Sequence, residues 1–459
     1  MILSLISCTA NVLPPPDTSP PVDSEVPVDS VPARLDETGL EYVPGLPELV
    51  PVLWLDPRGS ISDSEKTEGE LELIRPTDAD LDNLDDDPRS LVSDMGIQVH
   101  GSSSRYYDKQ GYRLELRDSQ GNDQARSMMG LPLGSDFVLH APYSDKTLVR
   151  NAFAYRMGRA VAGDAGPWQP RTRFVELFID GDYEGVYVLT ERVRRDGDRV
   201  DIAQPAASAG EGDLSGGYIV RIEQHRNEGW DTSSGTKIDY HYPRYEDISS
   251  EQDAWLKAWF ESFEAALMAE DWKQTYPDWL VVEDWIDHYI VNEMAHNIDA
   301  YRLSAYLYKD AEAEGGRLHA GPLWDFDRAF GNVNYCDCEN IEGFIIDDLT
   351  HCGEGYQYPF WWKRLLSDPA FTAQLRCRYE ELRGEQLSDA ELERALVELT
   401  AELEHAEPRD HQRWDTIGTH VDPNSWVGES YEEEVALLLD WQLRRAAWLD
   451  ANMPGTCAR

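Results

Sequence analysis

Two short acidic segments carry the residue types best suited to chemistry on a charged substrate. Asn297–Asp299 forms the first, and Asp325 and Asp327 form the second. Between them lie residues 304–309 and 317–323, two apolar runs joined by a glycine-containing turn, and this pattern predicts a small β-hairpin. In such an arrangement one carboxylate can position or deprotonate an acceptor hydroxyl, while the others hold a divalent metal that bridges phosphate groups.

An apolar frame surrounds the second acidic segment, where Leu323, Trp324, Phe326 and Phe330 flank the carboxylates. Asp-x-Asp alone is common in surface turns, so an ordinary acidic loop is the alternative interpretation. The apolar frame favours acids that project from a packed scaffold. Protein kinases show the same order, because their catalytic Asp precedes a hairpin and their metal-binding Asp follows it.

The elements that must position these loops fall into two parts. Residues 48–245 are rich in strand patterns and residues 246–459 in helix patterns. Asp180-Gly181 between two apolar runs is a strong hairpin signal, and Ser144 or Asp145 can cap a helix that follows. Strands are predicted at 52–55, 70–74, 96–100, 112–117, 174–179, 183–189 and 217–223, and helices at 255–267, 282–295 and over much of 358–452. This order predicts an α+β protein with a β-rich and a helical lobe and a cleft between them.

The charge of the chain restricts its partners. The formal net charge is −46, and the acidic residues are spread along the sequence. Such a surface repels DNA, RNA and anionic lipid, so nucleic-acid binding is not expected. It favours divalent metals and a basic protein or peptide substrate. Solubility or adaptation to salt is the alternative explanation of this acidity.

The N-terminal segment predicts an exported, lipid-anchored protein. Residues 1–8 are mostly apolar and end at Cys8 in a sequence similar to a bacterial lipobox. Residues 9–47 are rich in Pro and acids and predict an extended, disordered tether. We expect contact with the cell envelope only through a lipid on Cys8, because no other segment has the run of apolar residues that a membrane span needs.

The cysteines indicate disulfides more than a zinc site. Cys336 and Cys338 are separated by one residue, and the chain has no Cys-x-x-Cys pair, so a structural zinc site is not expected. In an exported protein, disulfides can form among the last five cysteines, with one thiol left unpaired.

Several of these segments, in this order, resemble the CotH spore-coat protein kinase family. Gly96–Ser104 and Lys109–Leu116 look like its opening motif, and Leu177–Glu191 is similar to its central hairpin. The resemblance runs over roughly residues 50–452 and also includes Ser144–Asn151, Gly217–Glu223, Asn297–Tyr308, Trp324–Gly331 and Trp441–Asp450. It implies a two-lobed atypical protein-kinase-like fold that uses ATP with Mg²⁺ or Mn²⁺ to phosphorylate Ser or Thr of exported proteins, as a monomer.

The resemblance also implies roles for individual residues. Asp299 would be the catalytic Asp, with Asn297 orienting its loop, and Asp325 and Asp327 would bind the metal. Lys109 would reach the nucleotide phosphates. The residues expected to assist at the nucleotide are Gly101, Ser102 and Ser103 in a turn over the phosphates, Glu191 as a partner of Lys109 or of the metal, and Arg150 on phosphate or in a salt bridge on its helix.

One position departs from the family pattern. Members usually carry Asn five residues after the catalytic Asp, whereas this chain has Ser304. A hydroxyl is a poorer metal ligand than an amide oxygen. The alternative hypothesis is therefore a non-catalytic cell-surface binding or scaffold protein with a pseudokinase domain.

Overall fold

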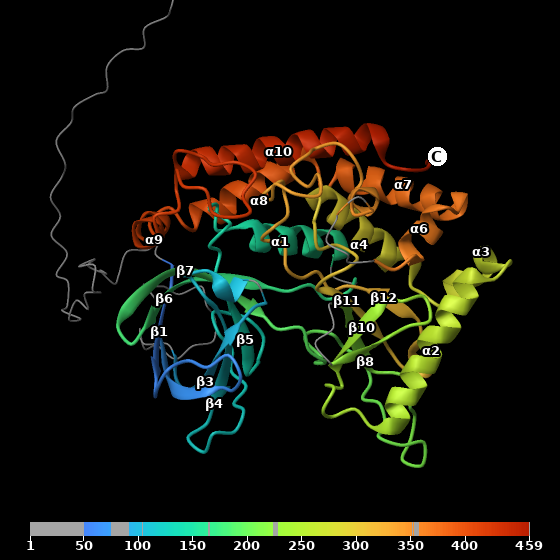
Figure 1. Ribbon diagram of the computed structural model, residues 1–459, viewed down its shortest axis with the longest axis horizontal. Helices are drawn as coiled ribbons and strands as arrows, with labels where there is room; N and C mark the ends of the chain where they lie inside the picture. The colour runs from blue at the N-terminus through green and yellow to red at the C-terminus, as the bar shows by residue number, and fades with distance from the viewer. Residues whose placement is uncertain are drawn as a thin grey trace, which may run out of the picture.

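The computed structural model describes residues 50–74, 91–102, 104–163, 166–223, 228–350, 352 and 358–458. The predicted segments 1–8 and 9–47, with Cys8, lie outside the described residues, as does Ser103. A barrel, a second sheet and a layer of helices make up the described chain (Figure 1).

Seven strands close into a barrel in the order β1-β2-β3-β4-β5-β7-β6. Parallel pairing of β6 with β1, in which Val52 is opposite Glu176, completes the closure. The strands are β1 (Val52–Pro57), β2 (Thr67–Ile74), β3 (Leu91–His100), β4 (Gly111–Arg117), β5 (Asp136–His140), β6 (Thr172–Ile179) and β7 (Asp182–Glu191). Alternate residues such as Leu53, Ile97 and Leu114 fill the interior, so the residues beside them in sequence, such as Arg113, face outward.

A second, five-stranded sheet lies beside the barrel in the order β12-β11-β8-β10-β9. Its strands are β8 (Tyr218–Ile222), β9 (Gly229–Asp231), β10 (Lys237–Tyr242), β11 (Ala305–Lys309) and β12 (Leu318–Ala320). The sheet therefore draws strands from both sides of residue 245, where the sequence pattern changes from strands to helices. Helix α2 (Ser250–Met268) packs on it through aromatic contacts, including the stacked rings of Tyr218 and Trp255, 5.7 Å apart.

The helices gather along one side of both β structures (Figure 1). They include α1 (Arg150–Ala162) and α4 (Val282–Ala295), with α3 (Trp272–Thr275), α5 (Ile345–Asp348), α6 (Trp361–Leu366), α7 (Pro369–Gly384), α8 (Asp389–Ala401), α9 (Glu407–Trp414) and α10 (Tyr431–Asn452). Helix α4 has the predicted bounds. Helix α1 begins later than expected, because Asp145 folds into the preceding turn and accepts a hydrogen bond from the backbone N–H of Arg150 at 2.8 Å.

The mixed α+β class with a β-rich first part and a helical second part is confirmed. The sequence pattern did not show that the first part is a closed barrel. No helix within the described ranges has the length and apolar character needed to cross a membrane.

Two disulfides fix the helical part. Cys336 pairs with Cys352, and Cys377 on α7 pairs with Cys457 near the C-terminus. The buried thiol of Cys338 is the free cysteine of the described chain. One of the last five cysteines therefore stays unpaired, as the sequence analysis expected for a disulfide-bonded chain.

A buried ion pair joins the barrel to α9. The Lys109 ammonium contacts a carboxylate oxygen of Asp410 at 2.5 Å, and the same oxygen accepts a hydrogen bond from the Val186 backbone N–H at 2.7 Å. Gly185 leaves room for this carboxylate, because a Cβ there would lie 2.3 Å from it. Burial lowers the Lys109 pKa, and the charge of Asp410 opposes that effect.

We expect Lys109→Met to lower the free energy of unfolding by about 3–5 kcal/mol, because it leaves the Asp410 carboxylate buried without its partner. The double variant Lys109→Met/Asp410→Leu should recover much of this loss. Urea denaturation measures both changes. The matched control is Lys257→Met, which breaks an exposed pair with Asp253 on α2 and should change stability by at most about 0.5 kcal/mol. A loss as small for Lys109→Met as for the control would contradict the structural role of Lys109.

Candidate active site

A cavity of about 910 Å³ lies between the barrel and the second sheet. Residues of β3, β4, β5 and β7 line one wall, residues of β8, β10 and β11 line the other, and α1 contributes Asn151 and Tyr155. Of the residues singled out in the sequence, those that line the cavity are Asp299, Asp325, Asp327, Gly101, Ser102, Ser304 and Trp324. Its volume is within the range of small-molecule and cofactor sites.

The end of α4 positions Asp299. The helix stops at His296, whose left-handed backbone (φ 46°) turns the chain away from the helix axis. The side-chain oxygen of Asn297 then accepts a hydrogen bond from the Asp299 N–H at 3.1 Å. Burial raises the pKa of Asp299 to about 6, although the nearby Arg328 guanidinium opposes the rise. Asp299 is therefore a weakly solvated carboxylate at the edge of the cavity.

Helix α1 positions the second acidic loop. The Tyr155 hydroxyl accepts a hydrogen bond from the Asp325 N–H at 3.1 Å, and the Asn151 side-chain oxygen accepts one from the Phe326 N–H at 2.6 Å. Burial and the charges of Asp327 and Asp299 raise the Asp325 pKa well above its usual range. The charges of Asp327 and Asp299 thus disfavour ionisation of Asp325.

The backbone around these carboxylates is unusual. Ser304, Asp325, Tyr301 and Phe330 all have positive φ values, from 49° to 67°. Such conformations are rare for residues other than glycine, and each costs on the order of 1 kcal/mol or more. Strain of this kind persists where the surrounding structure fixes the chain, and it clusters at functional sites.

The donor atoms fit a divalent cation that arrives with phosphate. Within the described part of the chain, no group of three or more His, Cys, Asp or Glu could hold a metal ion. Asp325 and Asp327 still supply two carboxylates, and the Ser304 hydroxyl donates to the Asp325 carboxylate at 3.2 Å. Mg²⁺ is usually bound by one or two carboxylates, substrate phosphates and water, so this donor set suits a metal–nucleotide complex.

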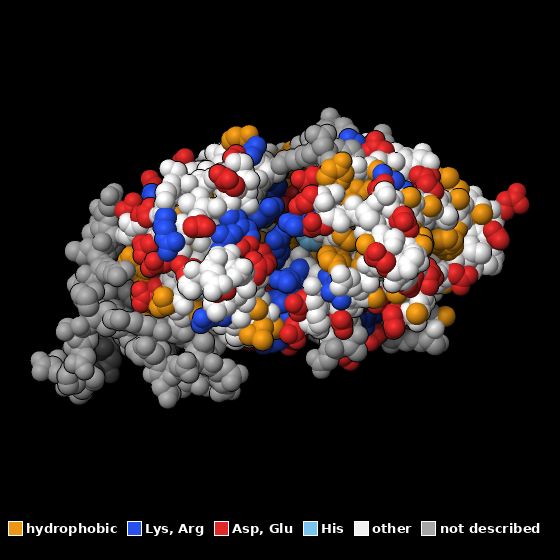
Figure 2. All heavy atoms as spheres, turned by 90° about the horizontal axis from the view of Figure 1, so that it is seen from below, with side chains coloured by type: hydrophobic (Ala, Val, Ile, Leu, Met, Phe, Trp, Pro, Cys, Tyr) orange, Lys and Arg blue, Asp and Glu red, His pale blue; other side chains and the backbone are white. Residues whose placement is uncertain are grey.

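Arginines line the same cavity as the carboxylates. Figure 2 shows the molecule from below the view of Figure 1. Basic side chains gather there in the hollow between the two halves of the surface, with acidic side chains around the hollow. The arginines among the lining residues are Arg105, Arg113, Arg192, Arg221, Arg244 and Arg328. Guanidinium groups keep their charge at any ordinary pH and bind phosphate oxygens in a fixed fork.

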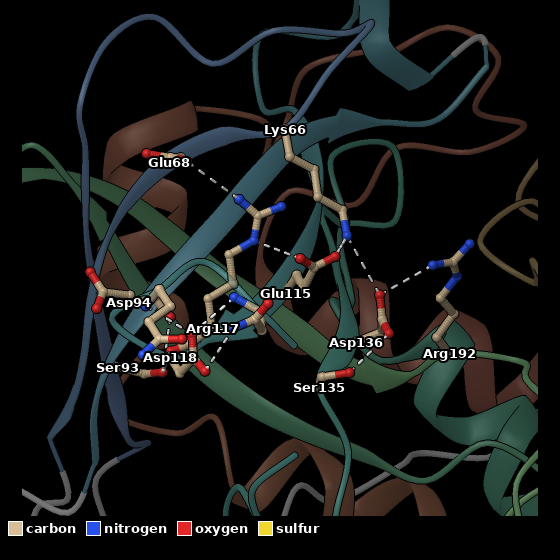
Figure 3. Close-up of polar contacts among 12 residues, drawn as sticks. Lys66, Glu68, Ser93, Asp94, Glu115, Arg117, Asp118, Ser135, Asp136 and Arg192 are labelled. Carbon is tan, nitrogen blue, oxygen red and sulfur yellow. Dashed lines mark hydrogen bonds and ion pairs between the residues drawn. The ribbon is translucent and has the colours of Figure 1, made fainter. Parts of the chain in front are cut away.

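A charged network on the outside of the barrel holds one of these arginines (Figure 3). Arg192 contacts a carboxylate oxygen of Asp136 at 3.3 Å. Asp136 also contacts Arg194 at 3.2 Å and Lys66 at 3.7 Å, and Lys66 pairs in turn with Glu115. One carboxylate is thus shared among three cations, and it orients Arg192 without neutralising it completely.

The structure does not bring Lys109 to the cavity. Its ammonium is buried against Asp410, and the predicted pairing of Lys109 with Glu191 is wrong. Glu191 instead binds Arg171 at 2.6 Å and Arg199 at 3.3 Å, because the barrel turns its side chain toward the loops at 171 and 199.

Arg150 is not among the lining residues. Its buried guanidinium forms a 2.5 Å ion pair with Asp145, so it makes a salt bridge, although the partner lies in the turn before α1 and not on the helix as expected. The predicted contact of Arg150 with phosphate therefore has no support in this structure, since the group faces its own helix start.

Sequence reasoning missed much of the cavity wall. Arg113 and Arg221 each interrupt an apolar strand, and this placement is a signal that was available. The alternation of side chains along β4 shows that Arg113 points away from the barrel interior. It does not show which part of the molecule lies opposite the Arg113 side chain. Asn151 and Tyr155 carried no signal, because helical polar and aromatic residues are common in cores.

One comparison with known proteins agrees with the family resemblance that the order of motifs indicated. None of the curated proteins searched matches the chain. The family model described as CotH kinase protein matches residues 97–449. This span runs from within β3 into α10 and contains the three predicted site carboxylates, Asp299, Asp325 and Asp327. The chain therefore belongs to the CotH kinase protein family.

Proposed function

We propose that the protein transfers the γ-phosphate of ATP, with Mg²⁺ or Mn²⁺, to Ser or Thr hydroxyls of exported proteins. The observation that carries this proposal is the meeting of Asp299, Asp325 and Asp327 in one cavity that arginines also line. Family membership supports kinase chemistry. The cavity between two β structures, with helices behind it, is consistent with a two-lobed kinase-like fold.

Each residue can be given a task in this reaction. Asp325 and Asp327 would hold the divalent cation, which supplies positive charge to the phosphates. Asp299 would orient the acceptor hydroxyl and take its proton as the acceptor oxygen bonds to the γ-phosphorus. The bond from that phosphorus to its bridging oxygen breaks, and ADP leaves. The strained, hydrogen-bonded loops keep the carboxylates in place, so little reorganisation is needed.

The setting of the reaction is also a proposal. The two disulfides support an exported protein, because such bonds persist in oxidising compartments. The net charge of −46 supports a basic protein or peptide as acceptor and disfavours nucleic acid. We propose a monomer that reaches the cell envelope only through a lipid at Cys8.

A pseudokinase that binds partners without transferring phosphate is the second candidate. Ser304 favours it, because this residue occupies the position where the family usually has Asn. Its hydroxyl is directed to Asp325 and would be a weak ligand.

The first experiment is a thermal melt with ATP and Mn²⁺. A ligand that binds only the folded state at 100 times its Kd stabilises the protein by about 2.7 kcal/mol. We expect an upward shift of Tm that requires both ATP and metal, and its loss in Asp325→Asn/Asp327→Asn. Asp440→Asn, an exposed change on α10, is the control and should keep the shift. An equal shift in the double variant would refute the metal site.

Phosphate transfer tests Asp299. With labelled ATP, Mn²⁺ and a library of Ser and Thr peptides, Asp299→Asn should reduce transfer by about 100-fold or more, the value of a general base. Its ATP–Mn²⁺ melting shift should remain. Full transfer by this variant would remove Asp299 from the mechanism, and binding without transfer by the wild type would favour the pseudokinase.

Ser304→Asn separates the two candidates further. Asn tolerates the left-handed backbone at this position (φ 49°) and brings an amide oxygen beside Asp325. The Mn²⁺ concentration that gives half of the ATP-dependent rise in Tm should fall by about fivefold. This factor corresponds to the free energy of one ordinary polar contact. An unchanged or higher requirement would mean that residue 304 is not a metal ligand.

A further inference from the structure

Acidic side chains also line the cavity, but the Arg113 guanidinium forms no ion pair with any of them. Among the described residues, no carboxylate lies within the 4.0 Å ion-pair distance of the Arg113 guanidinium, whose Nε donates to His100 at 3.2 Å. In a chain with 87 acidic and 41 basic residues, a guanidinium without an acidic partner is unexpected. Its pKa is lowered by burial and by the charges of Arg192 and Arg221.

Arg192 and Arg221 do have acidic neighbours. Against the effect of burial, the charges of Tyr306, Glu223 and Asp239 raise the Arg221 pKa, and Arg221 contacts Asp239 at 3.4 Å. Its Nε is still buried without a hydrogen-bond partner among the described residues. Arg192 shares Asp136 with two other cations. The three arginines come from β4, the residue after β7, and β8, so both walls of the cavity contribute to one positive cluster.

The neighbouring histidines add no charge of their own. Burial, together with the nearby arginine charges, lowers the pKa of His100 and of His241 to about 3. Both rings are therefore neutral at ordinary pH. The positive potential of this wall comes from guanidinium groups alone, which do not switch with pH.

We propose that Arg113, Arg192 and Arg221 form a phosphate-binding wall that holds the polyphosphate of a nucleoside triphosphate. Three guanidinium groups on one cavity suit an anion with many oxygens, whereas a single carboxylate is satisfied by one bidentate arginine. The aspartates of the same cavity repel a bare anion, so positive groups on the walls are needed to hold it. This assignment rests on the proposed function and gives to arginines the task that the sequence suggested for Lys109.

The test uses tripolyphosphate without metal, because it probes the arginines directly. Titration calorimetry on the full chain should show binding that Arg113→Gln and Arg221→Gln each weaken by about 10-fold or more, as expected for a charge-assisted contact. Arg444→Gln is the matched control, since its exposed guanidinium on α10 lies outside the cavity lining and is paired with Asp440 at 3.1 Å, and it should change affinity by less than twofold. Equal affinity in Arg113→Gln and the wild type would overturn the proposal.

Two further measurements exclude a merely structural effect. The ligand-free Tm of Arg113→Gln should equal or exceed that of the wild type, because the change relieves repulsion from Arg192 and Arg221. A large fall in Tm would instead show that Arg113 stabilises the fold. Asp325→Asn/Asp327→Asn should bind metal-free tripolyphosphate more tightly than the wild type, and weaker binding would place the anion elsewhere.

Competition identifies the source of the phosphate. Tripolyphosphate should displace ATP–Mn²⁺, and a phosphoserine peptide should not. Displacement by the peptide alone would assign the wall to a phosphorylated acceptor and overturn the assignment to the nucleotide. The wild type could bind tripolyphosphate through Arg113, with binding lost in Arg113→Gln, and yet fail to bind ATP–Mn²⁺. That result would leave the cavity as an anion site and would refute the proposed kinase function separately.

Discussion

Repulsion between like charges around one cavity is the constraint on which the rest of the structure depends. The charge of Asp327 raises the cost of ionising Asp299 and Asp325, and Arg192 and Arg221 repel Arg113 on the walls. Neither cluster would form from a flexible chain, because each group would turn toward water. The fold must therefore hold both clusters in place at a cost in stability.

Several rigid elements share that task. The barrel is closed, so its strands have no free edge along which to shift, and it presents Arg113 and Arg192 on its outer surface. Helix α1 binds the backbone beside Asp325, and the buried pair of Lys109 and Asp410 secures α9 against the barrel. The left-handed residues near the carboxylates are tolerated because the buried rings of Tyr301 and Phe330 and the hydrogen bond from the Asp325 N–H to Tyr155 fix the chain there.

The sequence predicted the local features well and the distant ones poorly. The hairpin at Asp180-Gly181, helix α4 and the order of the acidic loops all follow from short-range patterns. Closure of the barrel requires β1 to pair with β6, and no local pattern encodes that pairing. The error at Lys109 has the same origin, because its partner Asp410 lies 301 residues later in the chain. Lys109 lies just before β4, and the direction of its side chain depends on the segment that packs against it, which is α9.

The choice of arginine over lysine on the cavity walls follows from desolvation. The buried or half-buried lysines Lys66, Lys109 and Lys309 all have lowered pKa values, with burial as the largest cause. An ammonium buried in the cavity wall would therefore move toward its neutral form and lose its attraction for an anion. Burial also lowers the Arg113 pKa, but a guanidinium starts so far above neutrality that it stays charged. A wall that must hold positive charge beside three carboxylates, before any ligand arrives, can rely on arginine where lysine would fail.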